Sequence, residues 1–278
     1  NVQNQLHFPT LDERLEYTVG YLGTQSFNLF HPSGDVPAVD DIDGDGDLDI
    51  LNFNTTGGYI EYYKNTAQED GLGCGLRFRM VDNCWGRFYE SGLSELIDLS
   101  MRVDSCANKD PWLPPLRGGR HAGSTLLTLD RDNDGDKEIL LGDLSFSNLT
   151  MLTNGGSKDT AHMTAQEIFF PANNTPVNIE IFPAAFHVDA NNDGKRDLLV
   201  APNILGYADD ATTWYYENTN TDARPLFNLI QQDFLVGDMV ELGTGAAPVF
   251  WDYDADGVLD LLIANERDFI TPNDQISS

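Results

Sequence analysis

Four acidic loops of one spacing constrain the fold of this chain more than any other feature. Each loop has Asp at position 1, Asp or Asn at position 3, Asp at position 5, Gly at position 6 and an acid at position 9, followed by a short apolar run. The loops begin at Asp41, Asp130, Asp189 and Asp252, so their separations are 89, 59 and 63 residues. This spacing predicts a repeat of about 60 residues, with about 30 further residues between the first two loops.

The loops carry the donor set of a hard cation. Oxygen ligands at alternating positions, roughly six or seven in a flexible arrangement, are typical of Ca²⁺. Glycine at position 6 permits a sharp turn, and position 7 would offer its backbone carbonyl. We therefore predict about four calcium ions, one in each loop. The predicted ligands are Asp41, Asp43, Asp45, Asp47 and Asp49; Asp130, Asp132, Asp134, Asp136 and Glu138; Asp189, Asn191, Asp193, Lys195 and Asp197; and Asp252, Asp254, Asp256, Val258 and Asp260.

The EF-hand begins in the same way but requires a bidentate glutamate at position 12 and flanking helices. Position 12 is here Asn52, Leu141, Val200 or Ile263, which excludes an EF-hand sensor. The acid at position 9 instead lies where the chain enters the next apolar run, so an ion would staple a β-hairpin turn. Solvated Asp-Gly turns without metal are the alternative, because both residues favour turns. Four matches, each with the glycine, favour the metal.

The segments around the loops have the pattern of short strands. Phe186 and Val188 alternate with His187 before the third loop, which predicts a strand with a buried face. Each loop is followed by a short apolar run that soon meets Asn, Gly or Pro. Further strands are expected at 59–63 and 213–217, where aromatic and β-branched residues concentrate. Since no helical stripe is found, the predicted fold is all-β.

Composition limits the class of partner. The chain has 278 residues, of which 45 are acidic and 16 basic, and its formal net charge is −29. This charge repels phosphate backbones, so we expect cations and no nucleic acid as ligands. No apolar stretch approaches the roughly 18 residues of a membrane helix, and we expect no direct membrane insertion. The N-terminus lacks a signal-peptide core, so the protein either stays in the cell or has already lost its signal peptide.

The three cysteines, Cys74, Cys84 and Cys106, fall within one 33-residue window, and their spacing matches neither a CxxC redox motif nor a zinc knuckle. We predict a disulfide between Cys84 and Cys106, with Cys74 left over, because this pair brackets the central strand-like part of the segment. Three free buried thiols are the alternative. We interpret residues from about 68 to 116 as an insertion, an elaborated loop within a single domain that covers 1–278.

The four loops resemble those of the FG-GAP or VCBS repeat family, whose blades carry D-x-D-x-D-G-x-x-D loops in calcium-supported β-propellers. The text between the loops, for example FPAAFHVDANNDGKRDLLVAPN, is similar to VCBS-repeat proteins of Bacteroidetes, which are commonly secreted by the type IX system. The resemblance implies a calcium-stapled propeller of about seven blades when complete, of which this chain covers part. It also implies a protein that is secreted or on the outer cell surface, with its signal peptide already removed.

Several classes of function remain open at this point. A binding or scaffold module would contact a surface protein, a glycan or a component of the secretion machinery, or would act as the spacer of type IX cargo whose activity lies in another domain. The alternative is a carbohydrate-active enzyme or an accessory glycan-binding propeller. We expect no enzyme and no catalytic residue, because the chain has no G-x-S-x-G elbow and no H-E-x-x-H helix, and its five histidines are scattered.

Three features bear on the glycan and enzyme alternatives. His121, which follows two arginines in RGGRHAGS, is interpreted as a loop residue. His187, in a predicted strand, is interpreted as a packed residue. The aromatic run Trp214–Tyr216 could stack on sugar rings, although in a propeller such residues more often form the core between blades.

Overall fold

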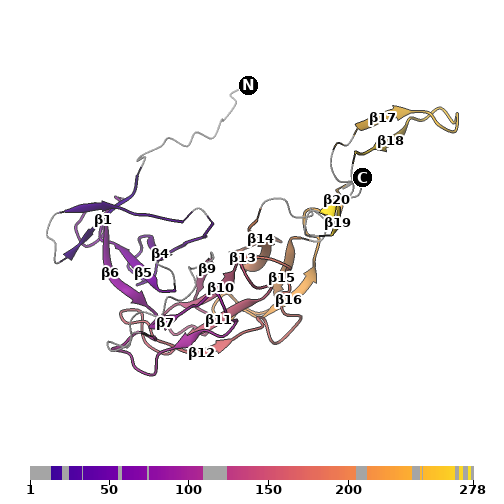
Figure 1. The fold of residues 1–278 in the computed structure, drawn as a ribbon. Coiled ribbons are helices and arrows are strands. Elements are labelled where there is room, and N and C mark those ends of the chain that lie inside the picture. The colour runs from indigo at the N-terminus through magenta and orange to yellow at the C-terminus, as the bar shows by residue number, and fades with distance from the viewer. Residues whose placement is uncertain are drawn as a thin grey trace. The chain divides into compact units, whose positions relative to one another are not determined.

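The computed structural model describes residues 14–20, 25–32, 34–55, 58–73, 75–108, 124–204, 212–239, 245, 247–266, 269–271 and 275–276 (Figure 1). These residues form strands, turns and no α-helix, which confirms the predicted all-β class. None of the described elements is a helix with the length and apolarity needed to cross a bilayer. Contacts divide the chain into two compact units, one of residues 1–140 and 152–166 and the other of residues 141–151 and 167–278.

Twenty strands are labelled in chain order. They are β1 (Glu16–Val19), β2 (Ser26–Asn28), β3 (Ala38–Asp40), β4 (Asp49–Phe53), β5 (Ile60–Asn65), β6 (Phe78–Trp85), β7 (Phe88–Tyr89), β8 (Asp98–Leu99), β9 (Ser124–Leu129), β10 (Glu138–Asp143), β11 (Leu149–Asn154), β12 (Met163–Glu167), β13 (Pro183–Val188), β14 (Asp197–Pro202), β15 (Trp214–Asn218), β16 (Phe227–Gln231), β17 (Ala247–Trp251), β18 (Asp260–Ala264), β19 (Phe269–Thr271) and β20 (Gln275–Ile276).

Most strands pair with their neighbours in the chain, as short connections require of antiparallel strands. The sheet orders are β2-β1-β6-β5-β4-β3, β12-β11-β10-β9 and β13-β14-β15-β16, with two-stranded sheets β17-β18, β19-β20 and β7-β8. The runs β3 to β6 and β13 to β16 are antiparallel throughout. β1 joins the edge of β6 in parallel, and β2 then pairs with β1 antiparallel.

All four acidic loops connect a strand to the next one. The loops join β3 to β4, β9 to β10, β13 to β14 and β17 to β18, and the acid at position 9 is the first residue of the second strand in each. Asp49 faces Asp40 across its hairpin, and Asp260 likewise faces Trp251. The predicted β-hairpin placement of the loops is therefore confirmed.

The apolar runs after the first two loops are buried along their whole length. Every residue of β4 and of β10 is buried, which explains why these runs are continuous instead of alternating. In the first sheet, Ile50 packs with Tyr63 and Phe78 in one cluster. Full burial of such a side chain contributes about 1.5 to 3 kcal/mol, so these inner strands supply much of the stability on which the loops depend.

The alternation of apolar residues before the third loop does not predict which residues of that strand are buried. β13 forms as predicted, but Phe186 and Val188 are 49% and 44% exposed, so the expected buried face there is wrong. The buried residues are Ala184 and Ala185 in the other half of the strand. Burial in β13 is thus confined to the half of the strand remote from the loop.

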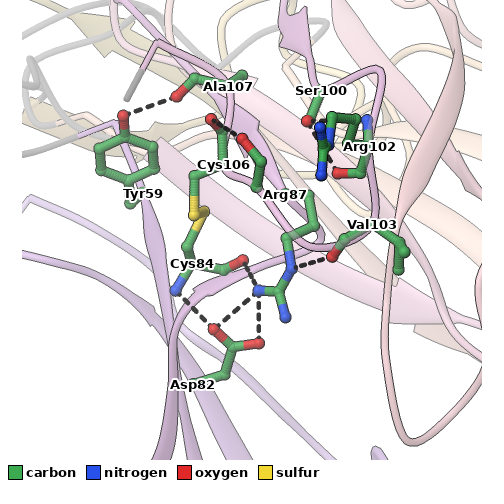
Figure 2. The surroundings of a disulfide bond; sticks show 10 residues. Tyr59, Asp82, Cys84, Arg87, Ser100, Arg102, Val103, Cys106 and Ala107 are labelled. Carbon is green, nitrogen blue, oxygen red and sulfur yellow. Dashed lines mark hydrogen bonds and ion pairs between the residues drawn. A yellow bond between two sulfur atoms is a disulfide. The ribbon is translucent and has the colours of Figure 1, made fainter. Parts of the chain in front are cut away.

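A disulfide closes the segment that follows the first sheet (Figure 2). Cys84 and Cys106 are bonded, which confirms the predicted pair, and Cys74 lies outside the described residues. Beside the disulfide, Arg87 Nη1 donates to both carboxylate oxygens of Asp82, at 2.9 and 2.7 Å. The bond and the ion pair hold the chain after β6 close to the end of that strand.

The segment interpreted as an insertion is only partly a loop. Its first half contains β6, which pairs with β5 as the fourth strand of the first meander, and its next part contains the small β7–β8 ribbon. Tyr59 reaches this ribbon region by donating its hydroxyl to the carbonyl of Ala107 at 2.8 Å (Figure 2). Residues 109–116 of the segment lie outside the described residues.

Candidate metal centres

The aspartate at position 1 organises each loop by accepting backbone N–H groups from the turn that follows it. The position 6 glycine donates in every loop: Gly46 to Asp41 at 3.2 Å, Gly135 to Asp130 at 3.2 Å, Gly194 to Asp189 at 3.0 Å and Gly257 to Asp252 at 3.0 Å. Side-chain acceptors of this kind stabilise tight turns. The position 5 aspartate accepts the N–H of position 7 in the same way. The four loops therefore share one conformation.

Two positions in each loop have a left-handed backbone. The glycines at position 6 have φ values of +94°, +91°, +88° and +87° in chain order, a region in which only glycine is free of steric cost. Position 4 is also left-handed, and there the residues are Gly44, Asn133, Asn192 and Ala255. Glycine and asparagine tolerate this conformation, whereas alanine is strained in it.

The acid at position 9 is buried and anchored in three of the loops. Asp49 and Asp197 have no exposed surface and Glu138 is 1% exposed. In the first loop, Asp49 Oδ2 accepts from Ile42 N–H at 3.2 Å and from the Tyr62 hydroxyl at 2.8 Å, while Oδ1 accepts Asn65 N–H at 2.8 Å. These bonds tie the loop to the strand that follows the hairpin.

The third loop repeats this anchoring. Asp197 Oδ2 accepts Ala190 N–H and the Tyr215 hydroxyl, both at 3.2 Å, and Oδ1 accepts Asn218 N–H at 2.8 Å. The tyrosine donors were not predicted as part of the site. The sequence does contain a signal for them. In both repeats a tyrosine lies three residues before the Asn that ends the third strand, Tyr62 before Asn65 and Tyr215 before Asn218.

Burial sets the protonation of these carboxyl groups in the ion-free protein. Burial raises the pKa of Asp49 to about 7, and it raises the pKa of Glu138 to about 7, with the Asp132 and Asp136 charges adding to the shift. Burial and then the neighbouring Asp134 carboxylate raise the pKa of Asp136 to about 6. A divalent cation among these groups would favour their charged forms and reverse the shifts.

Carboxylate oxygens of three loops come close enough together to hold one ion. The groups Asp41, Asp43 and Asp45; Asp130, Asp132 and Glu138; and Asp252, Asp254 and Asp260 each offer oxygens within 4.8 Å of one another. In the first two loops some of these oxygens are buried without a hydrogen-bond partner: Asp43 Oδ1, Asp47 Oδ1, Asp136 Oδ1 and Glu138 Oε1. Buried carboxylate oxygens without partners are costly. This donor set fits Ca²⁺, which binds oxygen ligands at flexible geometry.

The third and fourth loops contain fewer acidic residues than the first two, three and four against five. In the third, Asn191 Oδ1 accepts Asp193 N–H at 2.9 Å, and Lys195 forms an ion pair with Asp193 at 3.1 Å. In the fourth, position 7 is Val258, which offers an ion only its carbonyl. The four predicted sites therefore share a backbone geometry but differ in their carboxylates.

Lys64 of β5 lies against carboxylates of the first loop, a contact that was not predicted from the sequence. The Lys64 ammonium pairs with Asp43, Asp45 and Glu69. Burial lowers the pKa of Lys64, but its bonds to Asp43 and Glu69 outweigh burial and raise it above the ordinary value. Glu69 also groups with Asp45 and Asp47. No pattern in the sequence links Lys64 to a loop about twenty positions earlier, because the contact depends on how β4 and β5 pair.

The other candidate residues are structural or lie outside the described part. Trp214, Tyr215 and Tyr216 are 9%, 7% and 0% exposed, so they pack in the interior, as the preferred interpretation of the sequence expects, and they do not form a sugar-stacking surface. His187 is partly buried, with its ring 5.9 Å edge-on from that of Phe227, as expected of a packed residue. His121 lies outside the described residues.

Comparisons with known proteins return little. No family model matches the chain, and no curated protein matches it. Among solved structures, a lectin of Agrocybe aegerita described as recognising non-reducing terminal N-acetylglucosamine is similar at a TM-score of 0.33 and 14% identity. The match covers 82% of this chain, which spans 60% of the lectin chain. At this TM-score the two folds differ too much for the ligand of the lectin to be transferred.

Proposed function

We propose that this chain is a calcium-binding β-propeller module of the FG-GAP or VCBS type that serves binding or scaffolding, not catalysis. The observation that carries the proposal is made in the second loop. Glu138 is buried there, its Oε1 has no hydrogen-bond partner, and carboxylate oxygens of Asp130, Asp132 and Glu138 lie within 4.8 Å of one another. Bringing two further carboxylates up to a buried one is unfavourable unless a cation joins them. The calcium is structural, because each loop fastens a β-hairpin.

The arrangement of the first strands supports a propeller. β3 and β9 open the first two repeats, and they run alongside each other in parallel: Val36 N–H donates to Ser124 O at 3.0 Å, and Leu126 N–H donates to Val36 O at 2.9 Å. The innermost strands of neighbouring propeller blades have this relation around a central channel. The sheet β13 to β16, a four-stranded antiparallel meander, has the architecture of one blade.

The module belongs outside the cell, as secreted or surface-attached cargo of the type IX system, with a surface protein, a glycan or a component of the secretion machinery as its partner. Calcium sites suit this location, because extracellular modules bind the ion at about 10⁻⁴ to 10⁻³ M. Intracellular calcium concentrations would leave such sites empty. The disulfide Cys84–Cys106 agrees with an oxidising compartment.

Glycan binding remains the second candidate, and it rests on different aromatic residues from those first considered. Phe250, Trp251 and Tyr253 are 67%, 57% and 77% exposed, and they adjoin the fourth loop. Exposed aromatic rings can stack on sugars. Quenching of tryptophan fluorescence by a panel of soluble neutral and acidic oligosaccharides in wild type but not in Trp251→Ala would favour this candidate.

Calcium removal tests the main proposal. An ion that binds only the folded state adds RT ln(1 + [Ca]/Kd), about 2.7 kcal/mol per site at a hundredfold excess over Kd. We expect the melting temperature to fall on chelation and to recover with calcium but not with magnesium. Asp43→Ala and Asp254→Ala should each remove part of this gain, whereas Asp159→Asn, an exposed acid outside the loops, should not. A melting temperature unaffected by chelator contradicts the proposal.

A further inference from the structure

The second strand of the fourth hairpin is exposed where its counterparts are buried. β18 follows its loop as β4 and β14 follow theirs, yet Leu261 and Leu262 are 50% and 61% exposed. The corresponding residues Ile50 and Leu51 of β4 are 6% and 0% exposed, and Leu198 of β14 is 0% exposed. Within the described part of the chain β18 pairs with β17 alone, whereas β4 and β14 each lie between two strands. An apolar strand with an open edge can accept a further strand.

The first and third repeats show which kind of strand covers this edge. In both, the third strand runs antiparallel to the second, and a tyrosine lies opposite the residue two places after the position 9 acid: Tyr62 opposite Leu51, and Tyr215 opposite Leu199. Residues two apart in a strand share a face, so the tyrosine lies on the face of the acid. Its hydroxyl donates to the acid, at 2.8 Å in the first repeat and 3.2 Å in the third.

The same strand supplies a second donor to the acid. The N–H of the asparagine three residues after the tyrosine, Asn65 or Asn218, donates to the other carboxylate oxygen at 2.8 Å. In the fourth repeat Asp260 accepts, among the described residues, only the N–H of Tyr253 at 2.8 Å. The fourth repeat therefore has the acid and the apolar strand but neither of the donors that the third strand provides elsewhere.

We propose that the edge of β18 docks an extended segment of a partner protein, which adds antiparallel to β18 and has a tyrosine opposite Leu262 with an asparagine three residues later. The backbone of the segment extends the ladder, and its tyrosine hydroxyl and asparagine N–H donate to Asp260. The inference rests on the proposed binding role, and it gives that role a partner of defined chemistry, a strand with the pattern Tyr-x-x-Asn.

Two other occupants fit the edge less well. A second copy of the chain could pair its own β18 with this one, but residues 260–264 contain neither tyrosine nor asparagine, so Asp260 would gain no hydroxyl donor. The next described strand of the same chain, β19, pairs with β20 and leaves β18 open. A strand from a different protein meets both the apolar edge and the acid.

A synthetic peptide with the sequence of residues 212–219 tests the inference, because it contains β15, the covering strand of the third repeat. The fluorescein-labelled peptide is titrated with the full chain in excess calcium and followed by fluorescence anisotropy. We expect saturable binding that weakens by about tenfold or more with Tyr215→Phe in the peptide, which removes only the hydroxyl. N-methylation of the peptide at Asn218 should weaken binding to a similar extent. Neither change can disturb the folding of the chain itself.

Variants of the chain locate the binding site. Leu262→Asp should weaken binding by about tenfold or more, because the incoming strand would desolvate the new charge. Leu93→Asp, at a residue that is 75% exposed and outside the hairpin, should not. With the peptide bound, hydrogen exchange should slow in β18 and stay unchanged in β14, which excludes exchange of the peptide for the β15 of the chain.

Several results would overturn the inference. These are the absence of saturable binding, equal binding to Leu262→Asp and Leu93→Asp, a β18 edge that is already protected from exchange without peptide, and a dimer of the chain that Leu262→Asp abolishes. The melting experiment with chelator is a separate measurement. Failure of the peptide to bind therefore leaves the calcium proposal standing, and an unchanged melting temperature in chelator leaves the docking of the strand standing.

Discussion

At the scale of single residues, backbone hydrogen bonds to one aspartate shape each loop. The position 1 aspartate already holds the turn through backbone N–H groups, as Asp41 does with Gly44, Asp45 and Gly46 at 2.8 to 3.2 Å. Because these bonds come from the chain itself, an ion that binds the loop would have little of the turn left to order. This favours calcium as a stabilising clamp over calcium as a conformational switch.

Position 4 carries a residue-scale prediction. Ala255 has φ +62°, where glycine is unstrained and alanine costs about 1 kcal/mol or more. Ala255→Gly should therefore stabilise the fourth loop, by up to about 1 kcal/mol. The matched change Ala190→Gly, at position 2 of the third loop where φ is not left-handed, should instead destabilise by about 0.5 to 1 kcal/mol. Urea unfolding in excess calcium measures both, and equal effects of one sign would contradict the strain argument.

At the scale of elements, an asparagine links the third strand of each described meander to the loop and to the next turn. Its backbone N–H donates to the position 9 acid at 2.8 Å in the first and third repeats. Its side-chain Oδ1 accepts two further N–H groups: for Asn154, those of Gly156 at 3.0 Å and His162 at 2.9 Å. Asn65 and Asn218 make the corresponding pairs. One residue thus fixes the relation between loop, strand and turn.

This asparagine gives the element-scale prediction. Asn154 is 3% exposed, and Asn154→Ala leaves two N–H groups without their acceptor. Each buried unsatisfied group costs about 1 to 3 kcal/mol, so we expect a loss of roughly 2 to 4 kcal/mol in the free energy of unfolding. Asn83→Ala, at an exposed position of β6, should change it by less than about 0.5 kcal/mol. Chemical denaturation of the two variants makes the comparison, and similar losses would count against the link.

At the scale of the whole molecule, calcium offsets part of a large negative charge. The formal net charge is −29, and 17 of the 45 acidic residues lie in the four nine-residue loops. Four divalent ions would bring the formal charge to −21. Within a loop the carboxylates are closer together than the roughly 8 Å Debye length at physiological ionic strength, so salt screens their repulsion only in part. Bound ions act where this screening is weakest.

The pH dependence of the ion-free protein follows from the same charges. Asp49 and Glu138 have folded-state pKa values of about 7, above their ordinary 3.8 and 4.5, so the folded state binds these protons more tightly than the unfolded state. The stability that they contribute is fully present below about pH 4 and is lost as pH rises to about 7, by up to roughly 4 kcal/mol for Asp49 and roughly 3 kcal/mol for Glu138. In chelator, the melting temperature should therefore fall between pH 5 and pH 7.5.

Calcium and one variant separate this effect from other titrations. Excess calcium holds both carboxyl groups charged and should remove the fall between pH 5 and pH 7.5. Glu138→Gln retains an oxygen acceptor for Arg131 N–H but does not titrate, so it should reduce the fall in chelator. A chelated wild type whose melting temperature rises steadily across this range would contradict the raised pKa values.

The sequence by itself determined the local features: the all-β class, the four loops, their place between two strands and the cysteine pair. These depend on residues close together in the chain, since the spacing of Asp and Gly encodes a turn and short apolar runs encode strands. Only the tertiary structure decided which carboxylates are buried and that Tyr62 and Tyr215 donate hydrogen bonds to them. It also decided that Lys64 pairs with the first loop and that Asp136 Oδ1 is buried without a hydrogen-bond partner. The physical reason is that strand register and packing determine these contacts, and they join strands and loops whose relative position is not encoded in any local pattern.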